Sequence, residues 1–276
     1  MVIPYLRIIR PLNCLITALS VFVGAFLTDS FQFSRTLLMA CGSAFFISAA
    51  GNVMNDVFDL AIDRINKPSR PLPAGQVSKY QAVLWTCLLF LAGILLAFTG
   101  SIALFNIALL TTLGLILYSW ILKKTPLLGN LLVSFLSSLT FIYGAVAVNG
   151  FRWIFYPALF AFFFHLAREI SKTIEDMAGD QLGQARTLPL YLGKSFAKVL
   201  LTLIFVSLLF LTYLPYYWGE YNLKYLLVTL LGVDSGIIAF LVLLWINDSP
   251  SFLRRLNNLL KLNMLAGLLA LVMNKF

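Results

Sequence analysis

Long apolar runs alternate with short polar connections along most of this chain. A helix needs roughly 20 apolar residues to cross the hydrocarbon core of a bilayer, and the runs reach that length repeatedly. The pattern predicts nine membrane-spanning helices, with boundaries uncertain by about 2 to 4 residues. These helices lie at approximately 12–28, 36–54, 80–100, 102–121, 127–147, 154–174, 199–217, 225–246 and 256–274. We therefore expect an all-α, polytopic membrane protein.

Only two connections are long, the segments 55–79 and 171–198. Four predicted helices separate them, and each begins with acidic residues and continues with basic ones, which indicates a weak internal repeat. No soluble domain, low-complexity segment or linker interrupts the apolar pattern, so residues 1–276 are expected to form a single transmembrane domain. The first apolar run is one of many, which argues against a cleaved signal peptide.

Charged residues are scarce and unevenly placed. Hydrophobic residues make up 61% of the chain and charged residues only 11%. Sixteen of the 20 basic residues fall on one side of the predicted bundle, and the other side holds Arg35, Arg152, Lys224 and Lys275. The positive-inside rule then places the N-terminus and both long connections in the cytoplasm. Nucleic-acid binding is the weaker explanation of the net charge of +9, because the basic residues adjoin the membrane and share their loops with carboxylates.

Acidic residues gather in the two long connections. Seven of the 11 lie in two clusters, and these are Asp56, Asp59, Asp63, Glu169, Glu175, Asp176 and Asp180. An unpaired carboxylate in the membrane costs about 2.5 to 3.5 kcal/mol on insertion scales, so the clusters need partners. Asp234 lies alone within an apolar span, which suggests a function by default, but no second signature surrounds it.

The spacing of these residues favours two facing stripes. If the second helix continues past residue 52, one stripe carries Asn52, Asp56, Asp59 and Asp63, and the sixth helix carries Glu169, Lys172, Asp176 and Asp180. Two stripes of hard oxygen ligands repel each other unless a divalent cation separates them. Mg²⁺ prefers carboxylates together with phosphate oxygens and water. The pattern therefore predicts a clamp for a metal ion and a phosphate group.

Basic residues beside the clusters suit the same purpose. Charge-assisted donors to phosphate oxygens are available from Arg64, Lys67, Arg70, Lys123 and Lys172. The prolines and the glycine of "KPSRPLPAG", residues 67–75, predict a stiff turn that folds back over the helix ends. A diphosphate would then lie between metal ions and cations.

Two motifs carry a resemblance to a known family. "NDVFDLAIDRINKPSRPLPAG" and "REISKTIEDMAGD" closely resemble the two signatures of the UbiA superfamily of intramembrane prenyltransferases, and "LRIIRPLNCL", "LLGNLLVSFLSSLTFIYGAVAV" and "ARTLPLYLG" extend the similarity over most of the chain. The resemblance implies a bundle of about nine transmembrane helices with a central cavity. It also implies Mg²⁺-dependent ionisation of a prenyl diphosphate such as geranylgeranyl diphosphate, followed by capture of the carbocation by a lipid-like acceptor.

The resemblance also implies roles for individual residues. The metal ligands would be Asp56, Asp59, Asp63, Asp176 and Asp180. The catalytic residues would be Asp56, Asp59, Asp176, Asp180 and Lys172. The substrate-binding residues would be Asn52, Asn55, Arg64, Lys67, Arg70 and Lys123. The mouth of the site would open toward the cytoplasm.

The second motif is most similar to the ether-lipid branch of the superfamily, whose pattern runs R-E-x-x-K-D-x-E-D-x-x-G-D. The chain has Thr173 where that pattern usually has Asp. In this branch the acceptor is the free hydroxyl of geranylgeranylglyceryl phosphate. In other branches it is a carbon of an aromatic ring, which remains the alternative.

Other interpretations stay open from the sequence alone. A secondary transporter also combines intramembrane carboxylates with an internal repeat, although its charges tend to lie near the bilayer midplane on broken helices. The aspartates could instead pair with nearby cations, and Asn52 and Asn55 could end a helix. His165, the only histidine, and the cysteines Cys14, Cys41 and Cys87 are expected to pack within the core. The D-G-x-x-A-R pattern of CDP-alcohol phosphotransferases is absent.

Overall fold

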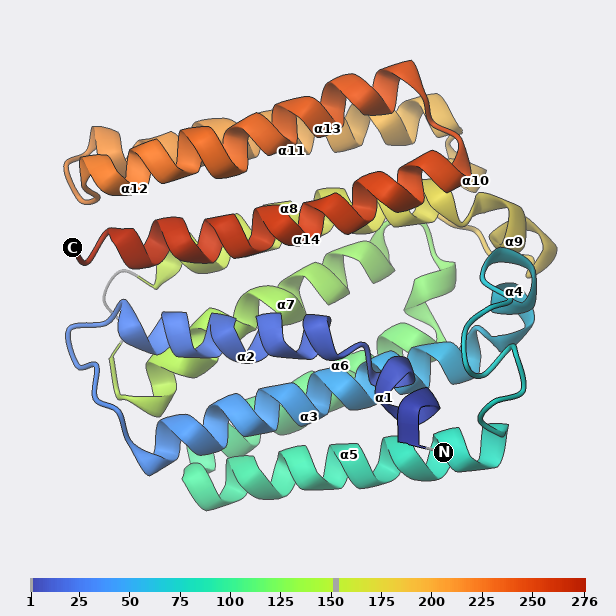
Figure 1. Ribbon diagram of the computed structural model, residues 1–276, viewed down its shortest axis with the longest axis horizontal. Helices are drawn as coiled ribbons and strands as arrows, with labels where there is room; N and C mark the ends of the chain where they lie inside the picture. The colour runs from blue at the N-terminus through green and yellow to red at the C-terminus, as the bar shows by residue number, and fades with distance from the viewer. Residues whose placement is uncertain (1, 151–153) are drawn as a thin grey trace.

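The structure, a computed structural model, describes residues 2–150 and 154–276 (Figure 1). The elements are α1 (Val2–Ile9), α2 (Pro11–Phe26), α3 (Arg35–Phe58), α4 (Leu60–Asn66), α5 (Lys79–Gly100), α6 (Ile102–Trp120), the 3₁₀ turn η1 (Leu122–Lys124), α7 (Leu128–Ala147), α8 (Phe155–Glu175), α9 (Met177–Leu182), α10 (Leu188–Tyr191), α11 (Lys194–Tyr217), α12 (Leu223–Val228), the π-helical segment η2 (Thr229–Asp234), α13 (Ser235–Ile246) and α14 (Pro250–Met273). All regular structure in the described ranges is helical, as expected.

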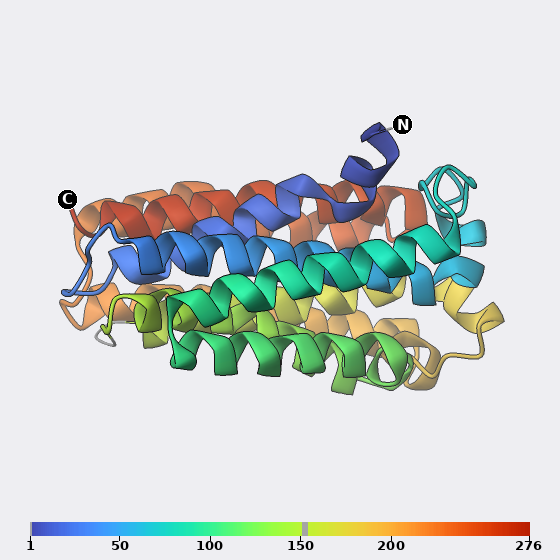
Figure 2. The same cartoon turned by 90° about the horizontal axis from the view of Figure 1, so that it is seen from below.

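Seven helical segments of the described chain are long and apolar enough to cross a membrane. An eighth is added if the bent pair formed by α1 and α2 counts as one span. The multi-span prediction is therefore confirmed, whereas α8 carries too many charges in its last turns to be counted on composition alone. Seen from below, the long helices run side by side (Figure 2).

The predicted helix boundaries differ from the structure mainly near the basic end of the bundle. The helix predicted at 199–217 begins at Lys194, and the one predicted at 256–274 begins at Pro250. Gly193 has a φ of 91°, a conformation that favours glycine and separates α10 from α11. Pro250 occupies the first turn of α14, where its missing N–H is not needed. Both helices thus begin before their apolar runs.

The N-terminal helix bends sharply at Arg10. α1 and α2 meet at an angle of 49°, and Arg10 between them has a φ of 55°. Pro11 disfavours the right-handed helical conformation for the residue before it, so the helix is interrupted there. The bend aims α1 away from the bundle at the end where α4 and α9 lie (Figure 2).

The second predicted helix continues past Asn52, but neither aspartate-bearing helix continues through its whole motif. α3 ends at Phe58, Asp59 has φ −87° and ψ 2°, and the short helix α4 follows in a new direction. α8 ends in the same way, with Asp176 at φ −93° and ψ 3° before the short helix α9. The two breaks fall at corresponding positions of the two motifs, which supports the predicted internal repeat. Figure 1 shows α4 and α9 side by side.

Glycines permit the closest contacts in the bundle. A Cβ atom on Gly144 of α7 would overlap the carbonyl oxygen of Val21, and one on Gly24 of α2 would overlap the carbonyl oxygen of Phe141. α2 and α7 therefore pack backbone against backbone, the small-residue packing that membrane helices favour.

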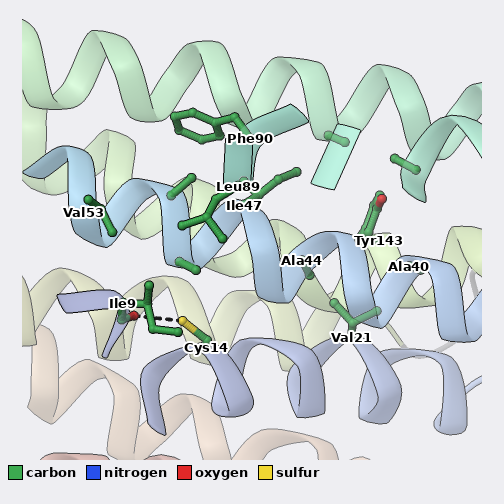
Figure 3. Packing of buried hydrophobic residues seen from close by; sticks show 14 of the residues in the cluster. Ile9, Cys14, Val21, Ala40, Ala44, Ile47, Val53, Leu89, Phe90 and Tyr143 are labelled. Atoms are coloured by element: carbon green, nitrogen blue, oxygen red, sulfur yellow. Dashed lines mark hydrogen bonds between the residues drawn. The ribbon is translucent and has the colours of Figure 1, made fainter. Parts of the chain in front are cut away.

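The apolar core spans the bundle in three clusters. In the first, Ile47 of α3 packs with Leu89 and Phe90 of α5 (Figure 3). Cys14 is buried there, and its Sγ lies 3.1 Å from the carbonyl oxygen of Ile9. This confirms core packing for Cys14, whereas Cys87 is exposed on α5.

Candidate active site

A cavity of about 480 Å³ lies inside the bundle between α2, α3, α6, α7, α8 and α14. One part of its wall is apolar, with residues such as Ile47, Leu136 and Met264. The other part is polar and is formed where α1, α4 and α8 end, next to the loop after α4. Of the residues predicted to bind substrate or act on it, those on the cavity wall are Asn52, Asn55, Lys67, Arg70 and Lys172.

Asp56 and Asp63 share one guanidinium group. The Nη1 atom of Arg70 donates to Oδ1 of Asp56 at 3.2 Å and to Oδ2 of Asp63 at 2.5 Å. Arg10 donates a second hydrogen bond to Asp56, which is only 1% exposed. Burial raises the pKa of Asp63 despite the positive charge of Arg70. The pKa of Arg70 is itself raised, because Asp56 and Asp63 outweigh the effect of its burial.

Asp59 and Asp176, the residues at the two helix breaks, each bind a lysine from another element. Lys123 of η1 donates to Oδ2 of Asp59. Lys67, just after α4, donates to both carboxylate oxygens of Asp176 at 2.7 Å. The negative charge of Asp59 raises the pKa of Lys123 against the effect of burial. The ion pair of Lys67 with Asp176 thus joins the two motifs, and Lys123 ties the first motif to η1.

The surroundings of Asp180 disfavour its charged form. It lies in the short helix α9 and is 6% exposed. Burial, reinforced by the negative charge of Asp176, raises the pKa of Asp180 to about 6. The negative charge of Asp59 acts on both Asp180 and Asp63, so Asp59 stands electrostatically between the two motifs.

The donor set suits a hard divalent cation. Five aspartates lie at one end of the bundle, in α3, α4 and α9 and at the breaks that follow α3 and α8. Carboxylate oxygens are the protein ligands that Mg²⁺ prefers. In the part of the chain that the structure describes, no three His, Cys, Asp or Glu side chains stand close enough to hold a metal together. Most of the aspartates pair with cations instead, so binding a metal requires these ion pairs to rearrange.

Other predicted residues have simpler surroundings. Arg64 is exposed on α4 and does not line the cavity. Asn52 donates to the carbonyl oxygen of Ile9 at 2.9 Å, which ties α3 to α1. Asn55 accepts a hydrogen bond of 3.2 Å from Ser119 on α6. Both asparagines therefore brace helices while also lining the cavity.

Sequence reasoning missed a polar stripe on the last helix. Arg254 and Asn257 of α14 bind the carboxylate of Glu175 at 3.0 and 2.9 Å. Asn258 and Lys261 follow on the same helix and line the cavity. Polar residues at 254, 257, 258 and 261 recur at helical spacing within an apolar run, and this signal could have revealed them.

Two further polar residues lie deeper in the bundle. His165 lines both the main cavity and a neighbouring apolar pocket of about 90 Å³. Asp234 is buried in the π-helical segment, where Thr212 donates to it at 3.5 Å. It does not line the main cavity.

A model of the UbiA prenyltransferase family matches residues 17–265 of the chain. The chain is 32% identical to a digeranylgeranylglyceryl phosphate synthase of Methanosphaera stadtmanae over 98% of each sequence. It is 38% identical to the enzyme of that name from Sulfurisphaera tokodaii over 90% of this chain and 89% of the other.

Solved structures agree with these sequence relatives. A structure of a digeranylgeranylglyceryl phosphate synthase is 31% identical and superimposes with a TM-score of 0.74 over 99% of this chain and 98% of the other. The fold is also shared with a UbiA homologue from Archaeoglobus fulgidus bound to GPP and Mg²⁺, at 18% identity, a TM-score of 0.72 and coverage of 97% and 99%. The chain belongs to the UbiA family of membrane-embedded prenyltransferases.

Proposed function

We propose that this enzyme transfers a geranylgeranyl group from geranylgeranyl diphosphate to the free hydroxyl of geranylgeranylglyceryl phosphate, with Mg²⁺ as cofactor. One observation supports this most strongly. Two aspartate-bearing helix breaks, at Asp59 and Asp176, lie beside the polar end of a cavity. Lys67, the ion-pair partner of Asp176, lines this end, and much of the remaining wall is apolar. The same cavity therefore offers a polar end for a diphosphate group and an apolar wall for prenyl chains.

The cations of the site would hold the leaving group. Asp56, Asp59, Asp63, Asp176 and Asp180 would hold Mg²⁺, which would supply positive charge to the diphosphate oxygens. Lys67, Arg70 and Lys123 already stand at these carboxylates and can donate to phosphate oxygens beside them. Once the aspartates have exchanged these cations for metal, the same cations can stabilise charge that develops on the leaving diphosphate.

The apolar wall would protect the allylic carbocation. Side chains such as Ile47, Leu136 and Met264 offer no nucleophile and exclude water, which would otherwise capture the cation as an alcohol. The acceptor hydroxyl attacks the cationic carbon and forms the new ether bond, and its proton passes to an oxygen of the departing diphosphate. Diphosphate departs with the electron pair of the broken C–O bond.

We infer that α8 is a ninth span and that residues 1–276 form one prenyltransferase domain. α8 has 21 residues and runs alongside the other long helices (Figure 1). Its charges face the cavity or partners on α14 and not lipid, because Arg168, Glu169 and Glu175 are all buried. The polar end of the cavity would open to the cytoplasm, as the distribution of basic residues predicts.

The acceptor assignment rests on several relatives of the same name. Two of them are 32% and 38% identical over most of the chain. Thr173 replaces the Asp of the ether-lipid pattern, and its hydroxyl donates to the carbonyl oxygen of Ile170 at 2.8 Å. The second motif therefore offers Asp176 and Asp180 as metal ligands without a third aspartate on α8.

A competition assay tests this function. Purified protein receives labelled geranylgeranyl diphosphate, Mg²⁺, geranylgeranylglyceryl phosphate, 4-hydroxybenzoate and homogentisate, and the products are separated. We expect prenylated geranylgeranylglyceryl phosphate as the main product and no product with excess EDTA. Mainly aromatic product would overturn the acceptor assignment, and full turnover in EDTA would overturn the metal mechanism. A transporter would form no product at all.

A further inference from the structure

Arg168 is a buried cation without adequate partners. It lies on α8, lines the main cavity and is only 8% exposed. Its Nε–H has no hydrogen-bond acceptor in the described part of the chain. Its one ion-pair partner there is Glu169, whose Oε1 lies 3.4 Å from Nη1. A buried donor without an acceptor is destabilising, so this guanidinium group is suited to an anionic ligand in the cavity.

Two more cations face the same part of the cavity. Lys172 follows one helical turn after Arg168 and donates to Glu169 at 2.5 Å. Lys261 projects from α14 and lines the cavity. The charges of Lys261 and Arg168 repel each other, as do those of Arg168 and Lys172. We name Arg168, Lys172 and Lys261 the inner cationic cluster.

The inner cationic cluster has few negatively charged partners. Glu169 forms ion pairs with both Arg168 and Lys172. Glu175, the other carboxylate on this helix, is bound by Arg254 and Asn257. Three positive charges therefore face one carboxylate, which leaves room for about two negative charges. A phosphate monoester carries about −1.5 to −2 at neutral pH.

The inner cationic cluster borders the aspartate clamp, because the charge of Arg10, which pairs with Asp56, also acts on all three cations of the cluster. The cations of the clamp are balanced by aspartates. The pairs are Arg10 with Asp56, Arg70 with Asp56 and Asp63, Lys67 with Asp176, and Lys123 with Asp59. Arg168 precedes Asp176 by two helical turns, about 12 Å along the axis of α8 at about 1.5 Å per residue. This axial separation leaves places for two anionic groups along the cavity.

The spacing fits the two substrates of the proposed reaction. The attacking oxygen must come within about 3 to 3.5 Å of the donor carbon that loses diphosphate. In a glycerol monophosphate the free hydroxyl stands one or two carbons from the phosphate ester. A phosphate held by the inner cationic cluster would therefore leave its neighbouring hydroxyl between the cluster and the aspartate clamp.

We propose that the inner cationic cluster binds the phosphate group of the acceptor without a metal ion, and so selects phosphorylated glycerol lipids over neutral acceptors. This inference rests on the proposed function, because it assigns the acceptor side of the same cavity. The buried guanidinium group of Arg168 donates hydrogen bonds to the phosphate, and Lys172 and Lys261 supply the remaining positive charge. The donor diphosphate remains with the aspartates and Mg²⁺.

Steady-state kinetics with two acceptors test the proposal. Lys261→Met and Arg168→Gln are compared with Arg255→Met, which alters an exposed cation on the same helix as Lys261 outside the cavity. For Lys261→Met and Arg168→Gln we expect the KM for geranylgeranylglyceryl phosphate to rise roughly 10- to 100-fold, the effect of losing a charge-assisted hydrogen bond. The KM for the donor and the kcat/KM for geranylgeranylglycerol, which lacks the phosphate, should stay within about twofold of wild type, since neither involves the acceptor phosphate.

Equal losses with both acceptors, or an unchanged KM in Lys261→Met, would overturn the proposal. Lys261 is only partly buried, so this variant decides the matter even if Arg168→Gln does not fold. If wild-type protein prenylates no geranylgeranylglyceryl phosphate, the proposed function itself has failed. If wild type does so and the variants retain its KM, only the phosphate site has failed.

Binding in EDTA gives a second readout that does not depend on turnover. Geranylgeranylglyceryl phosphate is titrated into metal-free protein and followed by calorimetry. We expect wild type and Arg255→Met to bind it, and Lys261→Met to bind at least about tenfold more weakly. Loss of wild-type binding in EDTA would contradict a metal-independent phosphate site.

Discussion

Arg70 holds two buried aspartates at once, and this arrangement shows how the site remains stable without strong repulsion. Its Nη1 atom lies 3.2 Å from Asp56 and 2.5 Å from Asp63. The two carboxylates are 1% and 3% exposed. Buried carboxylates with no counter-charge would be costly, so the loop that carries Arg70 helps to assemble the site as well as to bind substrate.

At the residue scale, we predict that Asp56→Asn and Asp176→Asn each lower kcat by at least about 10²- to 10³-fold, because one ligand is lost from either half of the metal clamp. Asparagine preserves the shape of each side chain, so the protein should remain folded. Initial rates and thermal unfolding in detergent measure the two effects. Asp29→Asn, at the opposite end of the bundle, is the control. Near wild-type turnover in either site variant would refute a clamp built from both motifs.

The sequence predicted which acidic residues gather, because carboxylates beside apolar spans are rare and their spacing is visible. It did not predict their partners. Arg10 reaches Asp56 from the bend before α2, and Arg254 reaches Glu175 from α14. These contacts join residues that are 46 and 79 positions apart in the sequence, and they form only because the helices pack together. The spacing of residues along the chain does not show which helices will pack together.

Among the helices, the long spans could be predicted from the sequence, whereas the breaks at Asp59 and Asp176 could not. Both residues have φ near −90° and ψ near 0°, a sparsely populated region in which active-site residues recur. Neither break has a proline or glycine where the two helices join, so no helix-breaking residue in the sequence indicates it. The long spans, in contrast, were predicted well because the bilayer fixes their length.

The crossing of α2 and α7 provides a prediction about packing. A methyl group at residue 144 would overlap the carbonyl oxygen of Val21, so Gly144→Ala should destabilise the protein by about 1 to 3 kcal/mol. Gly267→Ala is the matched control, because its Cβ would meet Val233 at an ordinary 3.9 Å. Thermal unfolding in the same detergent compares them. A similar melting temperature for both variants would argue against tight packing at this crossing.

The start of α11 is tied to the loop before α14 by Asp248. Lys194 and Lys198 donate to its two carboxylate oxygens at 2.7 and 3.0 Å. The hydrogen bond from Lys194 is the main reason that the pKa of Asp248 lies below its usual value. A lowered pKa stabilises the folded state fully above the unfolded value of about 3.9, and the effect is lost as the pH falls through the folded value.

We therefore predict that Asp248→Asn lowers the free energy of unfolding by less than about 1 kcal/mol at pH 7, since the pair is partly exposed and screened. The difference from wild type should shrink as the pH falls below the unfolded value of about 3.9, and it should disappear once the pH is below the lowered folded pKa, where the wild-type carboxyl is also protonated. Melting temperatures measured at several pH values check this. A difference that persists at low pH would show that the carboxylate charge is not responsible.

At the scale of the whole molecule, the two ends of the bundle differ in charge and in structure. The polar end of the cavity shares its end of the bundle with the N-terminus, α4, α9 and α10 (Figure 1). The opposite end holds the C-terminus and the loop before α3, where Lys275 donates to the carbonyl oxygen of Thr28 at 3.3 Å. Arg152, also predicted for that end, lies outside the described residues.

The last prediction concerns orientation in the membrane. Basic residues concentrate at the end that carries the aspartates, and the positive-inside rule assigns that end to the cytoplasm. In a protein without its native cysteines, Ser69→Cys and Ser195→Cys should resist an impermeant maleimide in right-side-out vesicles and react only after permeabilisation. Ser30→Cys, in the exposed loop at the opposite end, should react at once. The reverse pattern would place the site outside, where neither a cytoplasmic prenyl diphosphate nor a cytoplasmic glycerol phosphate could reach it.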